Sequence, residues 1–553
     1  MKFIVKPAPE GGADDKKAGE GHAKGQTQNQ EKVDGGQAQQ DKLAIDAEGN
    51  LSPYNPITEM TAEEKALKEQ EDIPQSLHDV QRVLEERVGL NRSFDLVMRE
   101  MVFGGKRVGI FYCNGFAKDT VLTDIITRLS YAGEEAVQHH TLEAFFAELI
   151  PHIQVKKYAK MSEIVGQVLM GGSGFFIEGE TEAIAVDAKT YPVRSIGEPD
   201  LERVVRGSRD GFAETLLQNV TLVRRRIRDE RLKLEISQIG KRTKTDICVA
   251  YISDIANNDL VQEIKDRMKQ VQIDGLPLGE KQLEEMIVNK GWNPYPMVRY
   301  SERPDVVSAH LLEGHVCVFV DTSPSVMILP TTFFHHVQHA EEYRQTPFIG
   351  TYLRWVRFAG ILMSIFLLPL WYLIVAHPEL KPAGLEFLGP QKEGHLPLLT
   401  QFLLADIGID LMRMAAVHTP SPLATAMGLV AAILVGDIAV KTGLFINEVI
   451  LYLALASIGM FATPSYELGL ANRIVRLGLL VVTAIFGVPG MVIGSTVWLI
   501  LLASRKSYGA PYMWPFLPFN AKSFFSIIMR KPVLASKTRL SITKPIDGTR
   551  QPE

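Results

Sequence analysis

The sequence has few cysteines, and they lie far apart. The three in 553 residues are Cys113, Cys248 and Cys317, and each lies in an apolar run typical of a strand. An odd number at such wide spacing excludes a disulfide framework and a C-x-x-C metal site. We therefore expect all three to be core residues of a protein in a reducing compartment.

Other features are also missing, and each absence removes a class of protein. Residues 1–10 contain no long apolar segment and no cleavage-like site, which argues against a signal peptide and predicts a cytosolic N-terminal part. The net charge is −5 and no basic stripe precedes residue 357, so no nucleic-acid partner is expected. No set of nucleophile, base and orienting residue can be argued from the sequence, so we predict neither an enzyme nor a cofactor.

Charge is scarce between residues 358 and 503, where Leu, Ile, Val, Ala and Gly dominate. A helix must be about 20 residues long to cross a hydrocarbon core of about 30 Å. The apolar candidates of about that length are 358–376, 423–440, 444–462 and 477–503. Arg354 and Arg357 precede the first and a basic tail follows the last, so the positive-inside rule places both ends in the cytosol. Residues 346–510 are predicted to form an all-α polytopic membrane domain with about four spans.

The segment 397–418 does not fit a simple span, because charged residues share one of its faces. Asp406, Asp410 and Arg413 are spaced i, i+4 and i+7, with apolar residues opposite them. Such a helix could lie in the interface, enter the bilayer partway or cross within a bundle, and we expect partial insertion. Arg473 and Arg476 precede the last predicted span. In a simple four-span arrangement they would lie on the non-cytosolic side of the membrane, which argues against that topology.

The segment 104–334 contains an internal duplication. Two pairs of segments align without gaps, namely 111–129 on 250–268 and 164–186 on 307–329. Each copy has the pattern of a strand, a helix and a hairpin whose apolar strands flank a polar turn. We therefore predict an α/β cytosolic part with two similar lobes, 104–240 and 241–345, followed by the membrane domain.

The remaining segments carry no visible chemistry. Residues 1–55 are rich in Gly, Gln, Lys and Asp and nearly free of aromatics, so they are predicted to form a disordered tail. Residues 56–103 have a charged, helix-favouring composition and are predicted to be a helical lead-in. Residues 511–553 are predicted to be a basic cytosolic tail.

Four sequence blocks carry a family resemblance. EPDLERVVRGSRDGFAETLLQNVTLVRRRIRDERLK (198–233) contains an Arg-Gly-x-Arg-acidic-Gly-Phe core followed by an arginine cluster. The other blocks are GKRTKTDICVAYISDIAN, SERPDVVSAHLLEGHVCVFVDTSP and ATPSYELGLANRIVRLGLL. Together they resemble the A-subunit family of bacterial spore germinant receptors, known as the GerA type, over about residues 107–518. The sequence departs from the family at Ser208, usually Pro, and at 335–345, and it is more similar to a paralogue than to a nutrient receptor proper.

This resemblance implies a multi-pass protein of the spore inner membrane that acts in germination. It also implies a ring-shaped homo-oligomer that conducts small cations when triggered. The expected partners are the lipid bilayer, further copies of the chain and other spore membrane germination proteins. The alternative is a non-conducting receptor or scaffold subunit that senses a small molecule or anchors other germination proteins.

Charged residues within the apolar region are the candidates for an ion path, because charge at bilayer depth is costly unless it faces protein or water. They are Asp406, Asp410, Arg413, Asp437 and Glu448. The first three also align with two acids and one arginine of the family. The alternative is an interfacial helix on which Asp410 and Arg413 pair locally while the other acids face water.

An arginine cluster is the candidate oligomer interface, since guanidinium groups can bind an anion or a partner's carboxylates. Its members are Arg203, Arg206, Arg209, Arg224, Arg225 and Arg226. The alternative is a salt-bridge network with Glu202, Asp210, Asp229 and Glu230. We favour such a network, placed at an interface between subunits.

Two motifs superficially resemble ligand sites. His335 and His339 are four residues apart and His336 adjoins them, but the Glu of H-E-x-x-H is missing and no third ligand is evident, so no metal site is predicted. The run 171–174, GGSG, lacks the Lys-Ser/Thr of a phosphate loop and precedes a strand, so it is predicted to be a turn.

Overall fold

The computed structural model describes most of the chain. The described residues are 44–45, 51–52, 62–138, 141–191, 202–288, 291–381, 384, 389–392, 394–418, 428 and 437–550. They belong to two units, 1–57 and 58–553. In the first unit, β1 (Ala44–Ile45) pairs antiparallel with β2 (Leu51–Ser52), and the rest of the predicted disordered tail lies outside the described residues.

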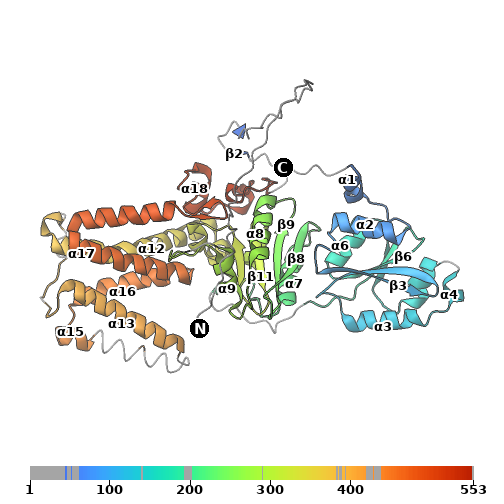
Figure 1. The fold of residues 1–553 in the computed structure, drawn as a ribbon, viewed down its shortest axis with the longest axis horizontal. Helices are drawn as coiled ribbons and strands as arrows, with labels where there is room; N and C mark the ends of the chain where they lie inside the picture. The colour runs from blue at the N-terminus through green and yellow to red at the C-terminus, as the bar shows by residue number, and fades with distance from the viewer. Residues whose placement is uncertain are drawn as a thin grey trace, which may run out of the picture. The chain divides into compact units, whose positions relative to one another are not determined.

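The first lobe is a five-stranded antiparallel sheet in the order β3-β4-β6-β7-β5 (Figure 1). Its strands are β3 (Leu96–Phe103), β4 (Lys106–Cys113), β5 (Val155–Tyr158), β6 (Ser173–Ile177) and β7 (Ala183–Val186). Buried residues alternate between the two faces: Phe111 and Phe176 pack against α2 (Leu77–Arg87) and α6 (Met161–Leu169), whereas Ile110 and Phe175 pack against α3 (Asp119–Ser130). Helices therefore cover both faces.

The second lobe repeats this topology, with strands in the order β8-β9-β11-β12-β10. Its strands are β8 (Leu232–Ile239), β9 (Thr245–Ile252), β10 (Arg299–Ser301), β11 (Val316–Val320) and β12 (Val326–Leu329). One face packs against α7 (Leu216–Arg226) and α10 (Pro304–Leu312), and the other against α8 (Asn258–Gln270) and α9 (Gly279–Ile287). The predicted duplication and fold class are confirmed, and Cys113, Cys248 and Cys317 are buried.

Both lobes begin earlier in the chain than predicted, since their first strands start before residues 104 and 241. The lead-in 56–103 is helical in α1 (Ala62–Glu69) and α2 but ends in β3, which pairs along its whole length with β4. Likewise, β8 pairs over eight residues with β9 and so belongs to the second lobe rather than the first. Charged residues interrupt the apolar pattern of both strands, Arg99 and Glu100 in β3 and Lys233 and Glu235 in β8, which hides them from a search based on apolar runs.

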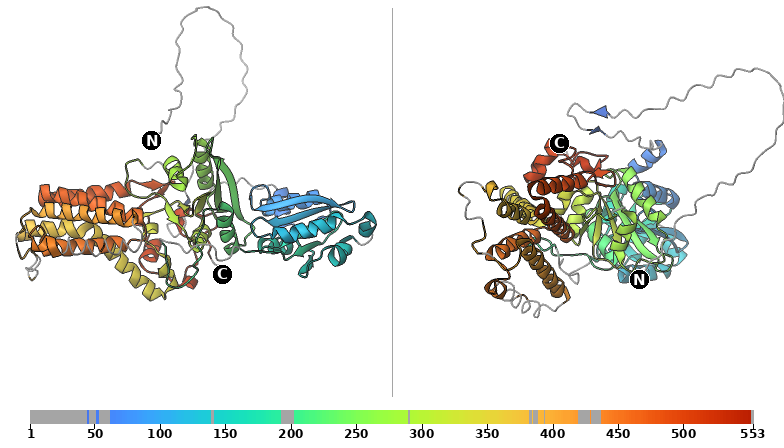
Figure 2. Two further views of the ribbon diagram at one scale, coloured as in Figure 1. Left: turned by 90° about the horizontal axis from the view of Figure 1, so that it is seen from below. Right: turned by 60° about the vertical axis from the view of Figure 1, so that its left-hand side comes forward.

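The membrane region is a helical bundle (Figure 2). Its helices are α12 (Pro347–Ala376), α13 (Leu398–His418), α15 (Ala439–Lys441), α16 (Asn447–Phe461) and α17 (Tyr466–Ala503). By length and composition, α12 and α17 can cross a membrane, while α16 is apolar but shorter. The rings of Trp371 and Tyr452 are 4.9 Å apart, and Gly360 contacts Gly459, so α12 and α16 pack antiparallel. The predicted span 423–440 lies mostly outside the described residues.

The helix α17 is two helices that fold back on each other at Gly487. Gly487 has φ 61° and ψ −136°, angles that favour glycine. Beyond the turn, Thr483 Oγ1 lies 3.6 Å from Met491 Sδ, and an added Cβ at Gly494 would lie 2.8 Å from Leu479 Cδ2. The prediction of a single interrupted span over 477–503 is therefore wrong, because the Gly-Val-Pro-Gly sequence closes a helical hairpin.

The helix predicted over 397–418 packs within the bundle as α13, and its partial insertion in the membrane stays a prediction. Within α13, Phe402 and Ala405 are buried, and the Phe402 ring packs 5.6 Å from Trp371 of α12. In contrast, Leu404, Ile407 and Leu411 are about half exposed. The helix lies in the bundle with its charged face inward, because lipid solvates apolar side chains and the protein interior pairs the charges.

The segment after residue 505 is not a free basic tail. It contains β13 (Lys506–Ser507), β14 (Ala510–Pro511) and α18 (Ala521–Ile528). Tyr512 is fully buried in the core of the second lobe, and the backbone N–H of Ile546 donates to Ile255 O at 2.9 Å. Several of its basic residues donate to backbone carbonyls, as Arg539 does to Leu312 O at 2.8 Å.

Short helical segments complete the described elements. They are α4 (Glu134–Gln138), α5 (Thr141–Ala144), η1 (Phe145–Leu149), η2 (Phe333–His336), α11 (Ala340–Arg344), η3 (Pro378–Leu380), η5 (Val533–Ala535) and η6 (Ser541–Thr543). Of these, η2 and α11 join the second lobe to α12.

The turn at Gly487 provides a test of the helical hairpin. In a Gly487→Ala variant the new methyl group would lie 2.7 Å from Nε2 of His377, in a backbone conformation that alanine disfavours. We expect a loss of about 1–3 kcal/mol of stability, measured as a lower thermal unfolding temperature of the protein in detergent. Gly478→Ala is the control, because an added Cβ there has no neighbour within 4 Å. Equal unfolding temperatures would contradict a turn that requires glycine.

Candidate functional site

The helices α13 and α17 bring their charged residues together inside the bundle. Asp406 is 1% exposed, and Arg473 and Arg476 are 3% and 1% exposed. The Arg476 guanidinium donates to Asp406 Oδ1 at 2.6 Å, and Arg473 Nε donates to Asp406 Oδ2 at 3.3 Å. One carboxylate therefore accepts hydrogen bonds from two guanidinium groups. We call Asp406, Asp410, Arg413, Arg473 and Arg476 the ion-pair centre.

The outer part of the ion-pair centre continues along one face of α13. Arg473 also pairs with Asp410, and Asp410 Oδ1 accepts from Arg413 at 2.6 Å. Asp410 is one turn from Asp406 and Arg413 lies three residues beyond it, so all three share the face that meets α17. Arg476 donates to Ser364 O of α12 at 3.3 Å. The ion-pair centre thus joins three helices.

The position along α17 places the ion-pair centre well inside the apolar region. Arg476 is 10 residues after Tyr466 and 11 before Gly487, about 15 Å along the helix at 1.5 Å per residue. Asp406, Arg473 and Arg476 are buried, so an unpaired charge there would cost several kcal/mol. Three guanidinium groups and two carboxylates leave a formal charge of +1 on the centre.

The structure groups some of the predicted ion-path residues and separates others. Asp406, Asp410 and Arg413 lie together, as their spacing predicted. Asp437 instead pairs with Lys441 at 2.6 Å, with both side chains more than half exposed. Glu448 Oε1 accepts from the backbone N–H of Gln391 at 3.1 Å. Among the described residues, neither acid contacts the ion-pair centre.

Sequence reasoning missed Arg473 and Arg476, which the four-span arrangement placed outside the membrane. They are three residues apart and so share one face of α17. Charge balance could have indicated them. The charged face of α13 carries two acids and one arginine, so one carboxylate has no partner on its own helix and needs a cation from a neighbouring helix.

The candidate interface arginines have different environments. Arg224 is fully buried between the lobes, where its Nε donates to Asp95 Oδ2 at 2.8 Å. Its inclusion in an oligomer interface is therefore wrong, because a partner subunit cannot reach it. Arg226 pairs with Asp210 at 2.6 Å, and the exposed Arg225 lies 4.5 Å from the centre of the Tyr191 ring. The exposed members are Arg203, Arg206, Arg209 and Arg225.

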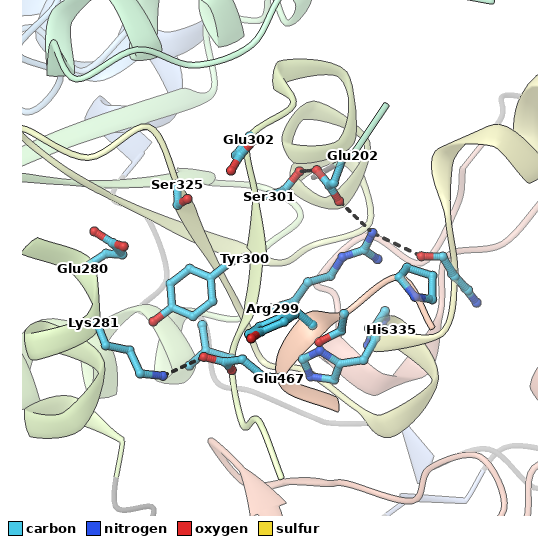
Figure 3. A pocket seen from close by; sticks show the side chains of 16 residues that line it. Glu202, Glu280, Lys281, Arg299, Tyr300, Ser301, Glu302, Ser325, His335 and Glu467 are labelled. Atoms are coloured by element: carbon cyan, nitrogen blue, oxygen red, sulfur yellow. Dashed lines mark hydrogen bonds and ion pairs between the residues drawn. The ribbon is translucent and has the colours of Figure 1, made fainter. Parts of the chain in front are cut away.

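A pocket of about 350 Å³ lies between the second lobe and the first turn of α17 (Figure 3). Lys281 of α9 pairs with Glu467 of α17 at 2.8 Å across one side. On the other side, Arg299 lies 3.7 Å from Glu202. Burial, together with Glu284, raises the pKa of Tyr300, so its hydroxyl remains protonated. Cations, carboxylates and a hydroxyl together suit a small polar ligand with both charges.

His335, which the sequence analysis considered together with His336 and His339, lies beside His310 and His315. The candidate ligand atoms of these three residues are all within 4.8 Å of one another. Burial lowers the pKa of His315 to about 4 and holds the pKa values of His310 and His335 well below their usual range. The sequence did not reveal this cluster, because His310 and His315 lie 25 and 20 residues before His335 and share no short motif with it.

The buried carboxylate gives a direct stability test. In Asp406→Asn, a neutral amide leaves the Arg473 and Arg476 charges without their shared partner, so we expect a loss of about 3–5 kcal/mol. Thermal unfolding in detergent measures it. Asp437→Asn removes an exposed pair and should cost about 0–1 kcal/mol. If both variants unfold at the same temperature, the ion-pair centre does not hold the helices together.

Comparison with known proteins identifies the family. The family model described as "Bacillus/Clostridium GerA spore germination protein" matches residues 82–542. Stage V sporulation protein AF of Bacillus subtilis (strain 168) is 47% identical over 466 residues, which cover 84% of this chain and 94% of that protein. The uncharacterized membrane protein YfkQ of the same organism is 29% identical over 444 residues, covering 79% and 86%.

One solved structure is also similar. It is the N-terminal domain of the A subunit of the Bacillus megaterium spore germinant receptor GerK3, at 26% identity and a TM-score of 0.37, covering 47% of this chain and 97% of that one. The family model covers most of the chain, including both lobes and the apolar helices. The resemblance seen in the sequence is thus confirmed, and the chain is a membrane protein that belongs to the GerA family of spore germination proteins.

Proposed function

We propose that this chain is a subunit of an oligomeric channel that passes small cations across the spore inner membrane during germination. The observation that supports this function is the ion-pair centre, buried at depth among apolar helices. Charged residues in such a position are costly, and in membrane proteins they commonly mark an ion pathway. The cytosolic lobes would then form the ring that responds to the trigger.

The ion-pair centre would hold the closed state. A carboxylate that accepts from two guanidinium groups has little capacity left for a passing cation. Conduction therefore requires α13 and α17 to move apart, so that Asp406 and Asp410 exchange arginine for a hydrated cation. The free energy of separating the pairs sets the threshold for opening.

The contacts between the second lobe and α17 provide a route for the trigger. Trp498 Nε1 donates to the Tyr295 hydroxyl at 2.6 Å, and that hydroxyl donates to Asn472 Oδ1 at 3.3 Å. Asn472 directly precedes Arg473. A movement of the second lobe would thus reach the ion-pair centre through adjacent residues of one rigid helix.

The alternative is a non-conducting receptor or scaffold subunit. The pocket beside Lys281 and Glu467 favours it, because a ligand there would contact both the lobe and the first turn of α17. Both functions share this pocket. They differ in whether ions cross the bundle.

An ion-flux measurement separates the two. The purified chain in liposomes should pass small cations above the level of empty liposomes, and Asp406→Asn with Asp410→Asn should change that flux at least several-fold, because both act on the barrier. Asp274→Asn, at an exposed pair in the second lobe, should leave it unchanged. A wild-type flux equal to that of empty liposomes favours the scaffold, and a variant flux equal to wild type contradicts the role of the two acids.

Crosslinking tests the oligomer. The native cysteines are buried, so a cysteine introduced at Arg206 should be the reactive one. We expect Arg206→Cys to give a ladder of crosslinked subunits in membranes treated with a bifunctional thiol reagent. Ile153→Cys, equally accessible in the first lobe, controls for random collision. The interface role of the arginine cluster fails if an oligomer is seen by mass but Arg206→Cys crosslinks no more than Ile153→Cys.

A further inference from the structure

We propose that His310, His315 and His335 form a Zn²⁺ site in the second lobe, a property separate from the proposed channel. The three side chains come from α10, from the loop before β11 and from η2. Their candidate ligand atoms all lie within 4.8 Å of one another. Imidazole nitrogen is a preferred ligand of zinc, and three histidines with one water complete a tetrahedral site.

The three rings lie close together, two pairs edge to face and one pair tilted. Their centroids are 5.0 Å apart for His310 and His315, 5.1 Å for His315 and His335, and 5.8 Å for His310 and His335. Zinc–nitrogen bonds of about 2.0–2.1 Å in a tetrahedral site require ligand nitrogens roughly 3.4 Å apart. Ring rotations and small shifts bring the nitrogens to that spacing without a change of fold.

Two of the rings have a nitrogen lone pair that could bind a metal, although the Arg299 guanidinium contacts one of them. His310 Nδ1 lies 2.8 Å from Val306 O, so it donates its proton there and leaves a lone pair on Nε2. Histidine ligands of metals commonly donate the other ring N–H to a carbonyl in this way. His315 is 1% exposed, and its buried Nδ1 has no hydrogen-bond partner. A buried polar atom of this kind requires an explanation, and a metal supplies one.

The third ring requires a change of tautomer. His335 Nδ1 lies 3.0 Å from both the backbone N and Oγ1 of Thr332, and it accepts from that backbone N–H. On coordination through Nε2, the proton of that nitrogen moves to Nδ1, where the Thr332 hydroxyl oxygen accepts it. The ring stays neutral, no proton is released, and one backbone hydrogen bond is lost.

One buried cation lies beside the cluster, and a carboxylate pairs with it. Arg299 lies 3.5 Å from His310 Nε2, and this contact would be exchanged for the metal. Glu202, 3.7 Å from Arg299, offsets the guanidinium charge. Burial disfavours a positive charge on the three rings, which suits neutral imidazole ligands. Imidazole ligands favour zinc over magnesium and calcium, which prefer oxygen.

The site would fix the segment that enters the membrane. His335 belongs to η2, and the chain continues from there through α11 into α12. Zinc would tie this connector to α10 and to the start of β11. It would therefore stabilise the joint between the second lobe and the membrane helices, whether or not the bundle conducts ions.

Metal analysis of the full-length protein tests the proposal. After treatment with a chelator and dialysis against micromolar free Zn²⁺, we expect one zinc per chain by mass spectrometry and a higher thermal unfolding temperature. His315→Gln and His310→Gln should each weaken zinc binding at least ten-fold. His339→Asn is the control, because asparagine keeps the N-cap of α11 and the residue lies outside the cluster. It should retain the zinc.

X-ray absorption spectroscopy of the bound zinc tests the proposal on the wild-type protein, so the result does not depend on whether a variant folds. Three imidazole ligands and one oxygen in the zinc spectrum are expected. The proposal is overturned if the wild-type protein retains no zinc, if the spectrum shows fewer than three imidazoles, or if His339→Asn loses as much zinc as His315→Gln.

Discussion

The pairing of buried guanidinium groups with carboxylates is the constraint on which the rest of this structure depends. At the ion-pair centre, Asp406 is shared by Arg473 and Arg476 where water cannot replace either partner. Desolvation makes each of these charges costly alone, so the helices that carry them must stay together. The positions of α13 and α17 in the bundle follow from this requirement.

The same kind of pair recurs at two other joints of the second unit. Arg224 and Asp95 join the two lobes, and Phe94 beside them donates its N–H to Leu234 O of the second sheet at 3.0 Å. At the base of α12, the fully buried Glu342 accepts from Arg354 Nε at 2.7 Å. These pairs hold the two lobes and the start of α12 in place, because separating either pair would leave a buried charge without its partner.

The sequence indicated the α13 side of the ion-pair centre but not the arginines of α17 that pair with it. Helical spacing brought Asp406, Asp410 and Arg413 onto one face, but periodicity cannot tell whether such a face meets water or another helix. The arginines opposite them were placed outside the membrane, because a hairpin at Gly487 cannot be distinguished from a kink in an apolar run. Arg224 was taken for a surface residue because an arginine-rich run does not show which member is buried.

The sequence by itself determined the two α/β lobes, their duplication, the membrane region and the family. These depend on local periodicity and on repeated blocks, which a linear pattern records. Only the tertiary structure decided that α13 faces inward, that α17 is a hairpin, that the C-terminal segment packs on the second lobe, and that His310 and His315 join His335. Each of those depends on contacts between residues far apart in the chain, for which burial and charge pairing select the partner.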